Sequence, residues 1–275
     1  MDIQWYPGHM KKTKEMLKEN IRLVNVVIEL LDARVPLSSQ NPELKDLLGN
    51  KNRVIVLNKY DLAEERHTAS WIDFFKGQGY SVVAANSAKG YGIRQLKAIL
   101  RNFKVPAHKG ERPVRAMVAG IPNVGKSSLI NAMAGKSVAK IGGIPGVTRG
   151  KQWIKILPGI ELLDTPGILW PKIESSEMGF HLAVTGAIKY EILNTEELVY
   201  KLLEIVISEK PQSLRNRYKL DELPRGAGDL LRDIGRKRGY LLPGGEIDNL
   251  KTSEVVLKEF REGLLGRFTL EVPPV

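Results

Sequence analysis

Residues 114–135 read VRAMVAGIPNVGKSSLINAMAG, and this stretch decides the fold class. Residues 114–119 are a short, mainly apolar run of strand length, and residues 126–134 form a helical pattern that Gly135 would end. Between them, residues 120–127 match the pattern G-x-x-x-x-G-K-[ST], a loop whose backbone N–H groups surround phosphate oxygens at the start of a helix. The stretch therefore predicts a strand, a phosphate-binding loop and a helix, in that order.

Strand and helix patterns alternate on the N-terminal side of this stretch. Such alternation predicts a parallel α/β sheet that binds its ligand at the carboxyl ends of the strands. On the C-terminal side, residues 152–157 and 160–163 predict a hairpin that adds an antiparallel edge strand. The expected strands are 24–31, 53–57 and 80–85, and the expected helices between them are 42–48, 68–77 and 93–103.

Beyond about residue 176 only helical patterns recur. We therefore expect an α/β domain over residues 1–175 and a helical domain over residues 176–275. In the last helix, expected to begin near Thr252-Ser253, the side chains of Val256, Phe260 and Leu264 should share one face. The other helices expected in this domain are 194–210 and 230–238.

Two polar motifs follow expected strands upstream of the phosphate loop. Asn58-Lys59-Tyr60-Asp61 comes after the strand at 53–57, and Asn86-Ser87-Ala88-Lys89 comes after the strand at 80–85. The Asp61 carboxylate can accept two N–H donors of guanine, a pair that adenine does not offer, so adenine would leave it unsatisfied. The Lys59 stem can pack along the base, and the second motif can present its loop to the guanine O6. Together the motifs predict GTP or GDP rather than ATP.

Residues in and after the phosphate loop predict contacts with a triphosphate and a Mg²⁺ ion. Lys126 would reach the β and γ oxygens, and the Ser127 hydroxyl would ligate Mg²⁺. Thr148 fits a switch threonine that closes on the metal, Asp164 fits a carboxylate that holds it through water, and Gly167 fits a backbone N–H at the γ-phosphate. The residues predicted to contact the nucleotide are Asn58, Lys59, Asp61, Asn86, Ser87, Ala88, Lys89, Asn123, Val124, Gly125, Lys126, Ser127, Ser128, Thr148 and Gly167.

The order of the motifs is unusual, because the base-recognition motifs precede the phosphate loop. This order resembles that of the circularly permuted GTPases. The whole chain, from Trp5-Tyr6-Pro7-Gly8-His9-Met10 through Asp32-Ala33-Arg34-Val35-Pro36 to the helical C-terminal part, resembles the YlqF/RbgA family. The resemblance implies a circularly permuted, Ras-like P-loop GTPase domain with an all-helical, RNA-binding C-terminal domain. It also implies hydrolysis of GTP to GDP and phosphate in late assembly of the large ribosomal subunit, with nucleotide-dependent binding to rRNA and pre-ribosomal particles.

Hydrolysis depends on a group that orients water, and the usual residue is missing. Ile168 stands after Gly167, where many GTPases carry a glutamine, so we expect turnover to be slow alone and stimulated by ribosomal particles. His9, in an expected Pro-Gly loop, is a candidate catalytic residue beside Lys126 and Thr148; a structural or exposed histidine is the alternative. Asn123 resembles the asparagine of potassium-dependent GTPases, which suggests K⁺ beside the phosphates, and an asparagine tolerated in a tight turn is the alternative.

Charge and composition indicate a partner and a compartment. The net charge is +11, and residues 1–175 carry 27 Lys and Arg against 15 Asp and Glu, so the excess lies on the nucleotide-binding half. Such a surface attracts nucleic-acid backbones, although basic runs such as Arg236-Lys237-Arg238 are also common on solvated faces. With no cysteine, no membrane-length apolar run and no evident signal peptide, we expect a cytoplasmic monomer that binds no membrane.

Two other functions stay open at this point. A GTP-gated RNA-binding module with incidental hydrolysis fits Ile168, and a GTPase that acts on another RNA fits the basic charge. Sedimentation with ribosomal particles in the presence of a GTP analogue or GDP would separate these possibilities from an assembly factor.

Overall fold

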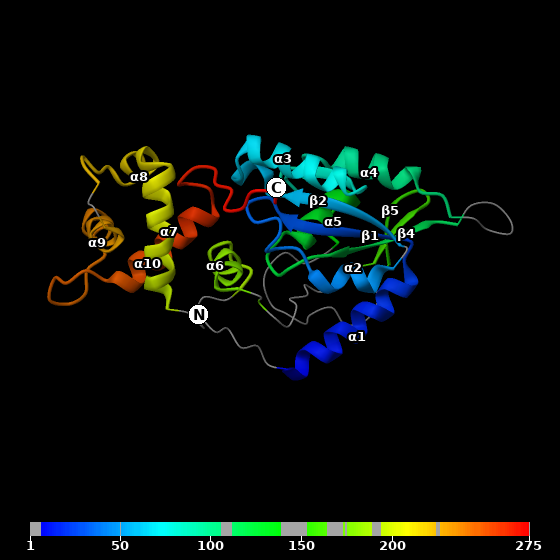
Figure 1. The fold of residues 1–275 in the computed structure, drawn as a ribbon, viewed down its shortest axis with the longest axis horizontal. Helices are drawn as coiled ribbons and strands as arrows, with labels where there is room; N and C mark the ends of the chain where they lie inside the picture. The colour runs from blue at the N-terminus through cyan, green and yellow to red at the C-terminus, as the bar shows by residue number, and fades with distance from the viewer. Residues whose placement is uncertain are drawn as a thin grey trace. The chain divides into compact units, whose positions relative to one another are not determined.

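The computed structural model describes residues 7–49, 51–105, 112–138, 153–163, 173, 175–188, 194–223 and 226–274, and for residues 7–14, 43 and 45 it describes the backbone alone. The chain forms two compact units (Figure 1). The first contains Met1–Gly179 together with Phe268–Val275, and the second contains Phe180–Arg267.

The first unit is built on a six-stranded sheet with the strand order β3-β2-β1-β4-β6-β5. Neighbouring strands are parallel except β5 and β6, which pair antiparallel as the hairpin pattern predicted. Every residue of β1, with the sequence VVIELLD, is buried, as expected for a parallel strand covered on both faces. The strands are β1 Val26–Asp32, β2 Asn52–Asn58, β3 Ser81–Ala85, β4 Val114–Ala119, β5 Trp153–Leu157 and β6 Ile160–Leu163.

Helices α1, α2 and α3 pack on one face of this sheet. One apolar cluster joins Ile21 of α1 and Leu44 of α2 to Val27 of β1, and another joins Trp71 of α3 to Leu31 of β1. Val27 and Leu31 are an even number of residues apart, so their side chains point to the same face. Helices α4 and α5 contact each other and strands β3, β4 and β5. The bounds are α1 Pro7–Leu23, α2 Pro42–Leu48, η1 Tyr60–Leu62, α3 Glu65–Gly77, α4 Ile93–Asn102 and α5 Lys126–Ala134.

The parallel arrangement decides where the predicted motifs meet. Strands β3, β2, β1 and β4 are consecutive in the sheet, and they run in the same direction. The loops that follow them, residues 33–41, 59–64, 86–92 and 120–125, therefore leave the sheet at one edge. That edge is the place where open α/β sheets bind ligands.

The second unit is helical. Its core side chains include Leu202 of α7, Ile234 of α9 and Phe260 of α10, all almost completely buried. Side chains cap two of its helices, because Asn194 Oδ1 accepts a hydrogen bond from the Glu197 N–H at 3.2 Å and Asp248 Oδ1 accepts one from the Lys251 N–H at 2.9 Å. Of its helices, α6 Ser176–Val184 begins just before the unit boundary, followed by α7 Thr195–Glu209, α8 Pro211–Tyr218, α9 Ala227–Arg238 and α10 Asn249–Arg261.

The structure corrects three expectations from the sequence. His9 was expected in a loop, but the backbone of residues 7–23 is helical, with Pro7 at the first helical position, which its fixed φ favours. Leu264 was expected on the buried face of the last helix, but α10 ends at Arg261 and Leu264 is 46% exposed. Residues 268–275 were expected in the helical domain, but they belong to the first unit, where Phe268 and Thr269 are buried.

Within the described residues, none of the helices is both long enough and apolar enough to pass through a lipid bilayer.

Candidate nucleotide-binding site

The predicted phosphate loop joins β4 to α5 in a conformation that depends on its glycines. A Cβ atom at Gly120 would lie 2.6 Å from the Leu30 carbonyl oxygen, and a Cβ atom at Gly125 would lie 2.4 Å from Asn58 Nδ2. Gly125 also has φ +104, a value that other residues rarely adopt. Asn123 has φ +58, in the left-handed region that asparagine tolerates better than most residues. The loop is thus fixed by close approach to its neighbouring strands.

The Lys126 side chain bonds back to the backbone of the phosphate loop. Its Nζ donates hydrogen bonds to the carbonyl oxygens of Gly120, at 3.0 Å, and Ile121, at 2.6 Å, and the residue is 9% exposed. An ammonium group at the first turn of a helix adds its charge to the N–H groups that this turn leaves without helical partners. Ser127 and Ser128 follow in the same turn and are half-buried. The arrangement is a positively polarised concave loop suited to an anion.

Asn58 ties three of the predicted motifs together. Its Nδ2 donates to the carbonyl oxygen of Val124 in the phosphate loop at 2.7 Å. Its Oδ1 accepts from the backbone N–H of Ser87 at 3.0 Å and from the Ser87 hydroxyl at 2.8 Å. Asn58 is only 3% exposed, so these bonds are shielded from water. One amide therefore sets the spacing between the phosphate loop and both predicted base-recognition loops.

Lys59 is held by a buried carboxylate that the nucleotide assignment from sequence had not included. Its Nζ lies 3.0 Å from Asp32 Oδ2, and Arg34 binds both oxygens of the same carboxylate, at 2.9 and 2.8 Å. Burial alone would raise the pKa of Asp32, but the positive charges of Arg34 and Lys59 and their hydrogen bonds hold that pKa well below its usual range. Lys59 itself has φ +56, a strained value for this residue type. The ion pairs thus help to hold Lys59 in a conformation that it would not adopt unaided.

Asp61, the predicted guanine-recognition residue, lies beside the second base-recognition loop. Lys89 Nζ is 3.4 Å from Asp61 Oδ2, and the Lys89 side chain is 75% exposed. Tyr60 stacks on Tyr91 with ring centroids 4.4 Å apart. The two loops are therefore joined by an ion pair and by an aromatic stack.

The loop at residues 86–92 is closed by its own backbone. Asn86 and Tyr91 exchange backbone hydrogen bonds of 3.2 and 3.1 Å, and Asn86 Oδ1 accepts from the Lys89 N–H at 2.9 Å. Gly92 is required at the end of the loop, since its φ is +79 and a Cβ atom there would lie 2.3 Å from the Ala84 carbonyl oxygen. Ser87 and Ala88 are thereby presented at the carboxyl end of β3.

Several predicted site residues lie outside the described residues. These are Thr148, Asp164 and Gly167, together with Ile168, and the side chain of His9. Of the three predicted Mg²⁺ ligands, only Ser127 is described. A half-buried hydroxyl in the first turn of α5, beside Lys126, is an oxygen ligand of the kind that Mg²⁺ takes in a phosphate-binding loop.

Asp32, Arg34, Tyr91 and Gly92 complete the site but were not assigned to it from the sequence. For Asp32 a signal existed, because it ends a strand, and parallel strands bring such residues to one edge. In the sheet Asp32 is the direct neighbour of Asn58. For Tyr91 the sequence offered no signal, since stacking on Tyr60 depends on how two loops pack.

Comparison with known proteins places these features in a family context. Residues 115–222 match the family model described as 50S ribosome-binding GTPase. A protein of Bacillus cereus called ribosome biogenesis GTPase A is 47% identical over 280 residues, covering 99% of this chain and 95% of that protein. Among solved structures, GNP-bound YlqF from T. maritima is similar with a TM-score of 0.71 and 28% identity, over 95% of this chain and 98% of that chain. A GDP-bound structure of TM YlqF has a TM-score of 0.70 and 28% identity, over 94% and 99%.

Proposed function

The chain belongs to the ribosome biogenesis GTPase A family, and from this we propose that it is a GTP-hydrolysing assembly factor that binds large ribosomal subunit precursors according to its nucleotide state. One observation carries the nucleotide part of the proposal. Asn58 joins the predicted phosphate loop to the predicted base-recognition loop at Ser87, and both loops follow strands at one edge of the sheet.

We assign roles within that site to residues on the described loops. The backbone N–H groups of residues 123–128 and the Lys126 ammonium would hold the β- and γ-phosphates, and Asp61 would accept the guanine N–H donors. Lys59 would lie along the base, positioned by Asp32. Ser127, with Thr148 and Asp164, would hold Mg²⁺, which when bound neutralises charge on the phosphates. These assignments rest on the sequence motifs, and Thr148 and Asp164 lie outside the described residues.

Potassium is a second proposed cation. Asn123 is exposed in the phosphate loop with φ +58, so its side chain does not belong to the packed core. Turnover measured in KCl and in NaCl at equal ionic strength tests the proposal, and we expect faster turnover in KCl. Equal rates would remove K⁺ from the mechanism.

The water-orienting group remains to be supplied, because Ile168 carries no polar atom. We propose His9 for this role, acting when ribosomal particles bind. The helix that contains His9 in this structure begins at Pro7, so residue 9 lies in its first turn, next to the N-terminal residues. We expect His9→Ala to abolish stimulation of GTP turnover by ribosomal particles while leaving GDP affinity intact. If stimulation is unchanged, His9 is not the catalytic group.

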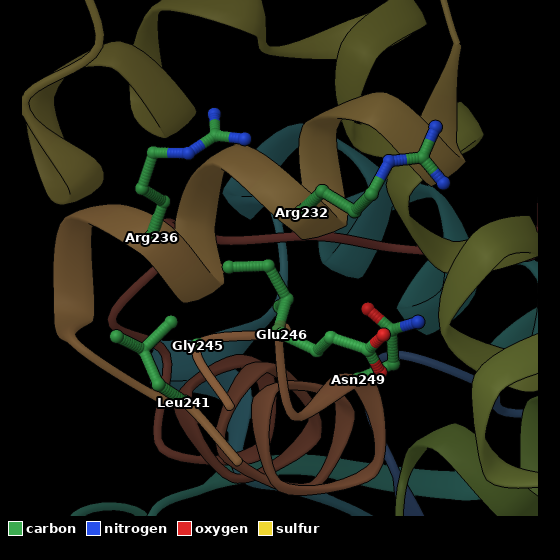
Figure 2. A pocket seen from close by; sticks show the side chains of 7 residues that line it. Arg232, Arg236, Leu241, Gly245, Glu246 and Asn249 are labelled. Atoms are coloured by element: carbon green, nitrogen blue, oxygen red, sulfur yellow. The ribbon is translucent and has the colours of Figure 1, made fainter. Parts of the chain in front are cut away.

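The helical unit presents a hollow of about 470 Å³ whose mixed lining includes two arginines, Arg232 and Arg236. Figure 2 shows Arg232 and Arg236 extending from α9 on one side, with Leu241, Glu246 and Asn249 on the other. We propose that this part of α9 contacts rRNA. Arg238 is unsuitable for testing that, since its guanidinium bonds the buried Glu259 at 3.2 Å and packs over Tyr218. The informative variant is Arg236→Gln with Lys237→Gln, which should weaken particle binding; full affinity would exclude the patch.

The experiment that tests the whole proposal is sedimentation with ribosomal particles. We expect selective association with large-subunit precursors in the presence of a non-hydrolysable GTP analogue and release with GDP. Binding that does not depend on the nucleotide, or turnover that particles do not stimulate, would favour a GTP-gated RNA-binding module with incidental hydrolysis. Association with another RNA in place of the ribosomal particle would favour the remaining alternative.

We also propose a site of action and an oligomeric state. We propose that the protein works in the cytoplasm and acts as a monomer. Light scattering of the purified protein, alone and with a GTP analogue, checks the second point.

A further inference from the structure

The last described residues of the chain return from the helical unit to the predicted guanine site. The helical unit ends at Arg267, and Phe268–Val275 belong to the first unit. The helical unit is therefore an insertion in the first unit, with a covalent connection at each of its ends. We call Phe268–Glu271 the C-terminal strap.

The strap is bound to the loops that follow β1 and β2. The Phe268 N–H donates to the Leu62 carbonyl oxygen at 2.9 Å, and the Leu270 N–H donates to the Arg34 carbonyl oxygen at 2.8 Å. Alternate residues thus bond like an added strand across two loops. Between these contacts, Thr269 Oγ1 accepts from the Glu64 N–H at 3.0 Å, at the start of α3.

Hydrogen bonds of Glu271 hold the end of the strap in place. Its carboxylate accepts hydrogen bonds from the backbone N–H groups of Leu37, at 2.7 Å, and Ser38, at 3.0 Å, and also from the Ser38 hydroxyl. Its carbonyl oxygen accepts from Trp71 Nε1 at 3.0 Å. Because the Glu271 carboxylate is charged, it accepts stronger hydrogen bonds than a neutral oxygen would. The Phe268 side chain, 1% exposed, adds buried apolar area to these polar contacts.

The residues that receive the strap adjoin those that would read the base. Leu62 follows Asp61 directly, within η1. Arg34, whose carbonyl oxygen accepts from the strap, binds the Asp32 carboxylate that holds Lys59. The strap therefore contacts the loop of Lys59 and Asp61 directly at Leu62 and Glu64. It also reaches Lys59 indirectly, through Arg34 and Asp32. A residue in a strained conformation, as Lys59 is, persists only where the surrounding contacts fix it.

We propose that the C-terminal strap is a positioning element of the guanine site, through which the attachment of the helical unit governs guanine affinity and specificity. The proposal rests on the guanine site assigned above. The strap is a covalent connection between the two units that leads directly to the base-recognition loop. By the reciprocity of coupled binding, nucleotide that orders the loop must also hold the strap.

Binding measurements on paired variants test this proposal. The first pair is a chain that ends after Arg267 and a control that ends after Glu271, which keeps the strap and removes only residues such as Val272, 65% exposed. The second pair is Glu271→Ala and a control, Glu254→Ala, which removes an exposed carboxylate from α10. Fluorescent GDP gives the affinity, and competition with GDP and IDP gives the base preference, since inosine lacks the 2-amino group that Asp61 would bind.

We expect Glu271→Ala and the shorter chain to bind GDP about tenfold more weakly, with a smaller GDP-to-IDP preference, while both controls stay within about twofold of the full chain. General loss of folding lowers GDP and IDP binding equally, so the ratio isolates a positioning effect; circular dichroism at the assay temperature confirms the fold. If the shorter chain does not fold, Glu271→Ala decides. An unchanged GDP affinity and ratio in folded Glu271→Ala overturns the proposal. Failure of the full chain itself to prefer GDP over IDP would instead refute the guanine site.

Discussion

At the scale of single residues, Asn58 illustrates how one side chain sets the spacing of a site. It bonds Val124 on the phosphate loop and Ser87 on the second base-recognition loop, and these partners are far apart in the sequence. The side chain is buried, so each lost bond leaves a polar group without water to replace it. Asn58 was predicted from the sequence to contact the nucleotide. In this structure its side chain forms hydrogen bonds to two protein loops.

This geometry gives a prediction for Asn58→Ala. Removing the amide leaves the Ser87 N–H and the Val124 carbonyl oxygen without their partner, and each such loss costs about 1–3 kcal/mol. We expect GDP affinity to fall by a factor of about 10 to 100. Titration with fluorescent GDP measures this affinity. The control is Asn102→Ala, at the exposed end of α4. Equal affinity of the two variants would mean that the loops keep their spacing without Asn58.

A second residue-scale prediction concerns Asp32. Its replacement by Asn leaves the buried guanidinium of Arg34 without a counter-charge, which costs about 3–5 kcal/mol in buried pairs. We expect the variant to unfold at correspondingly lower urea concentration at neutral pH. Asp46→Asn, at an exposed position on α2, serves as the control and should unfold like the unmodified chain.

The pKa of Asp32 also fixes the pH at which that difference disappears. Its folded-state pKa is depressed, so its contribution to stability is present above the ordinary pKa of about 3.9 and is lost as pH falls below it. The stability difference between the unmodified chain and Asp32→Asn should therefore shrink below about pH 4. A difference that stays constant through that range would show that the carboxylate charge is not what Arg34 requires.

At the scale of elements, the approach of α9 to α10 depends on a single glycine. A Cβ atom on Gly235 would lie 2.5 Å from Ile247 Cγ2 and 2.8 Å from Thr252 Oγ1. Gly228, in the same helix, has its nearest such neighbour, Tyr200 Cε1, at 4.0 Å. The two positions differ in packing and share a helical backbone, so they form a matched pair.

We expect Gly235→Ala to destabilise the helical unit by about 1–3 kcal/mol, because inserting a methyl group into a packed contact forces the helices apart. Gly228→Ala should be neutral or stabilising, since alanine favours a helix over glycine by about 1 kcal/mol. Thermal unfolding followed by circular dichroism compares the two. Equal effects at both positions would show that helix propensity, and not the α9–α10 contact, decides the outcome.

Elements also show what the sequence could and could not predict. The strands and the phosphate loop were predicted because their signals are local, such as an apolar run followed by glycines and Lys126. Helix α8 was not among the expected helices, and it begins at Pro211, directly after the helix expected at 194–210. The contact of Glu271 with Leu37 and Ser38 spans more than 230 residues, and no periodicity or motif in either segment indicates the other. Long-range polar contacts of this kind depend on the finished fold.

At the scale of the whole molecule, the placement of charge predicts how the protein meets its particle. The excess of basic residues lies within residues 1–175, and several of them on α4 and the start of β4, such as Arg94, Arg101 and Arg115, are exposed. Binding to RNA releases counterions, so the logarithm of the association constant should fall linearly with the logarithm of the KCl concentration. Sedimentation over a KCl series measures the slope. A flat dependence would mean that contacts with ribosomal proteins dominate.

The C-terminal strap has one more consequence, for the moment at which the protein is made. Synthesis runs from the N-terminus, and domains fold in that order as they emerge. The loops after β1 and β2 are therefore complete early, whereas Phe268–Glu271, which bond to those loops, emerge only after the whole helical unit. A nascent copy would have its phosphate loop folded before its base-recognition loop is fastened. Full selectivity for guanine would then arise only once the helical unit and the strap have emerged, so that copies still lacking them do not compete for ribosomal particles.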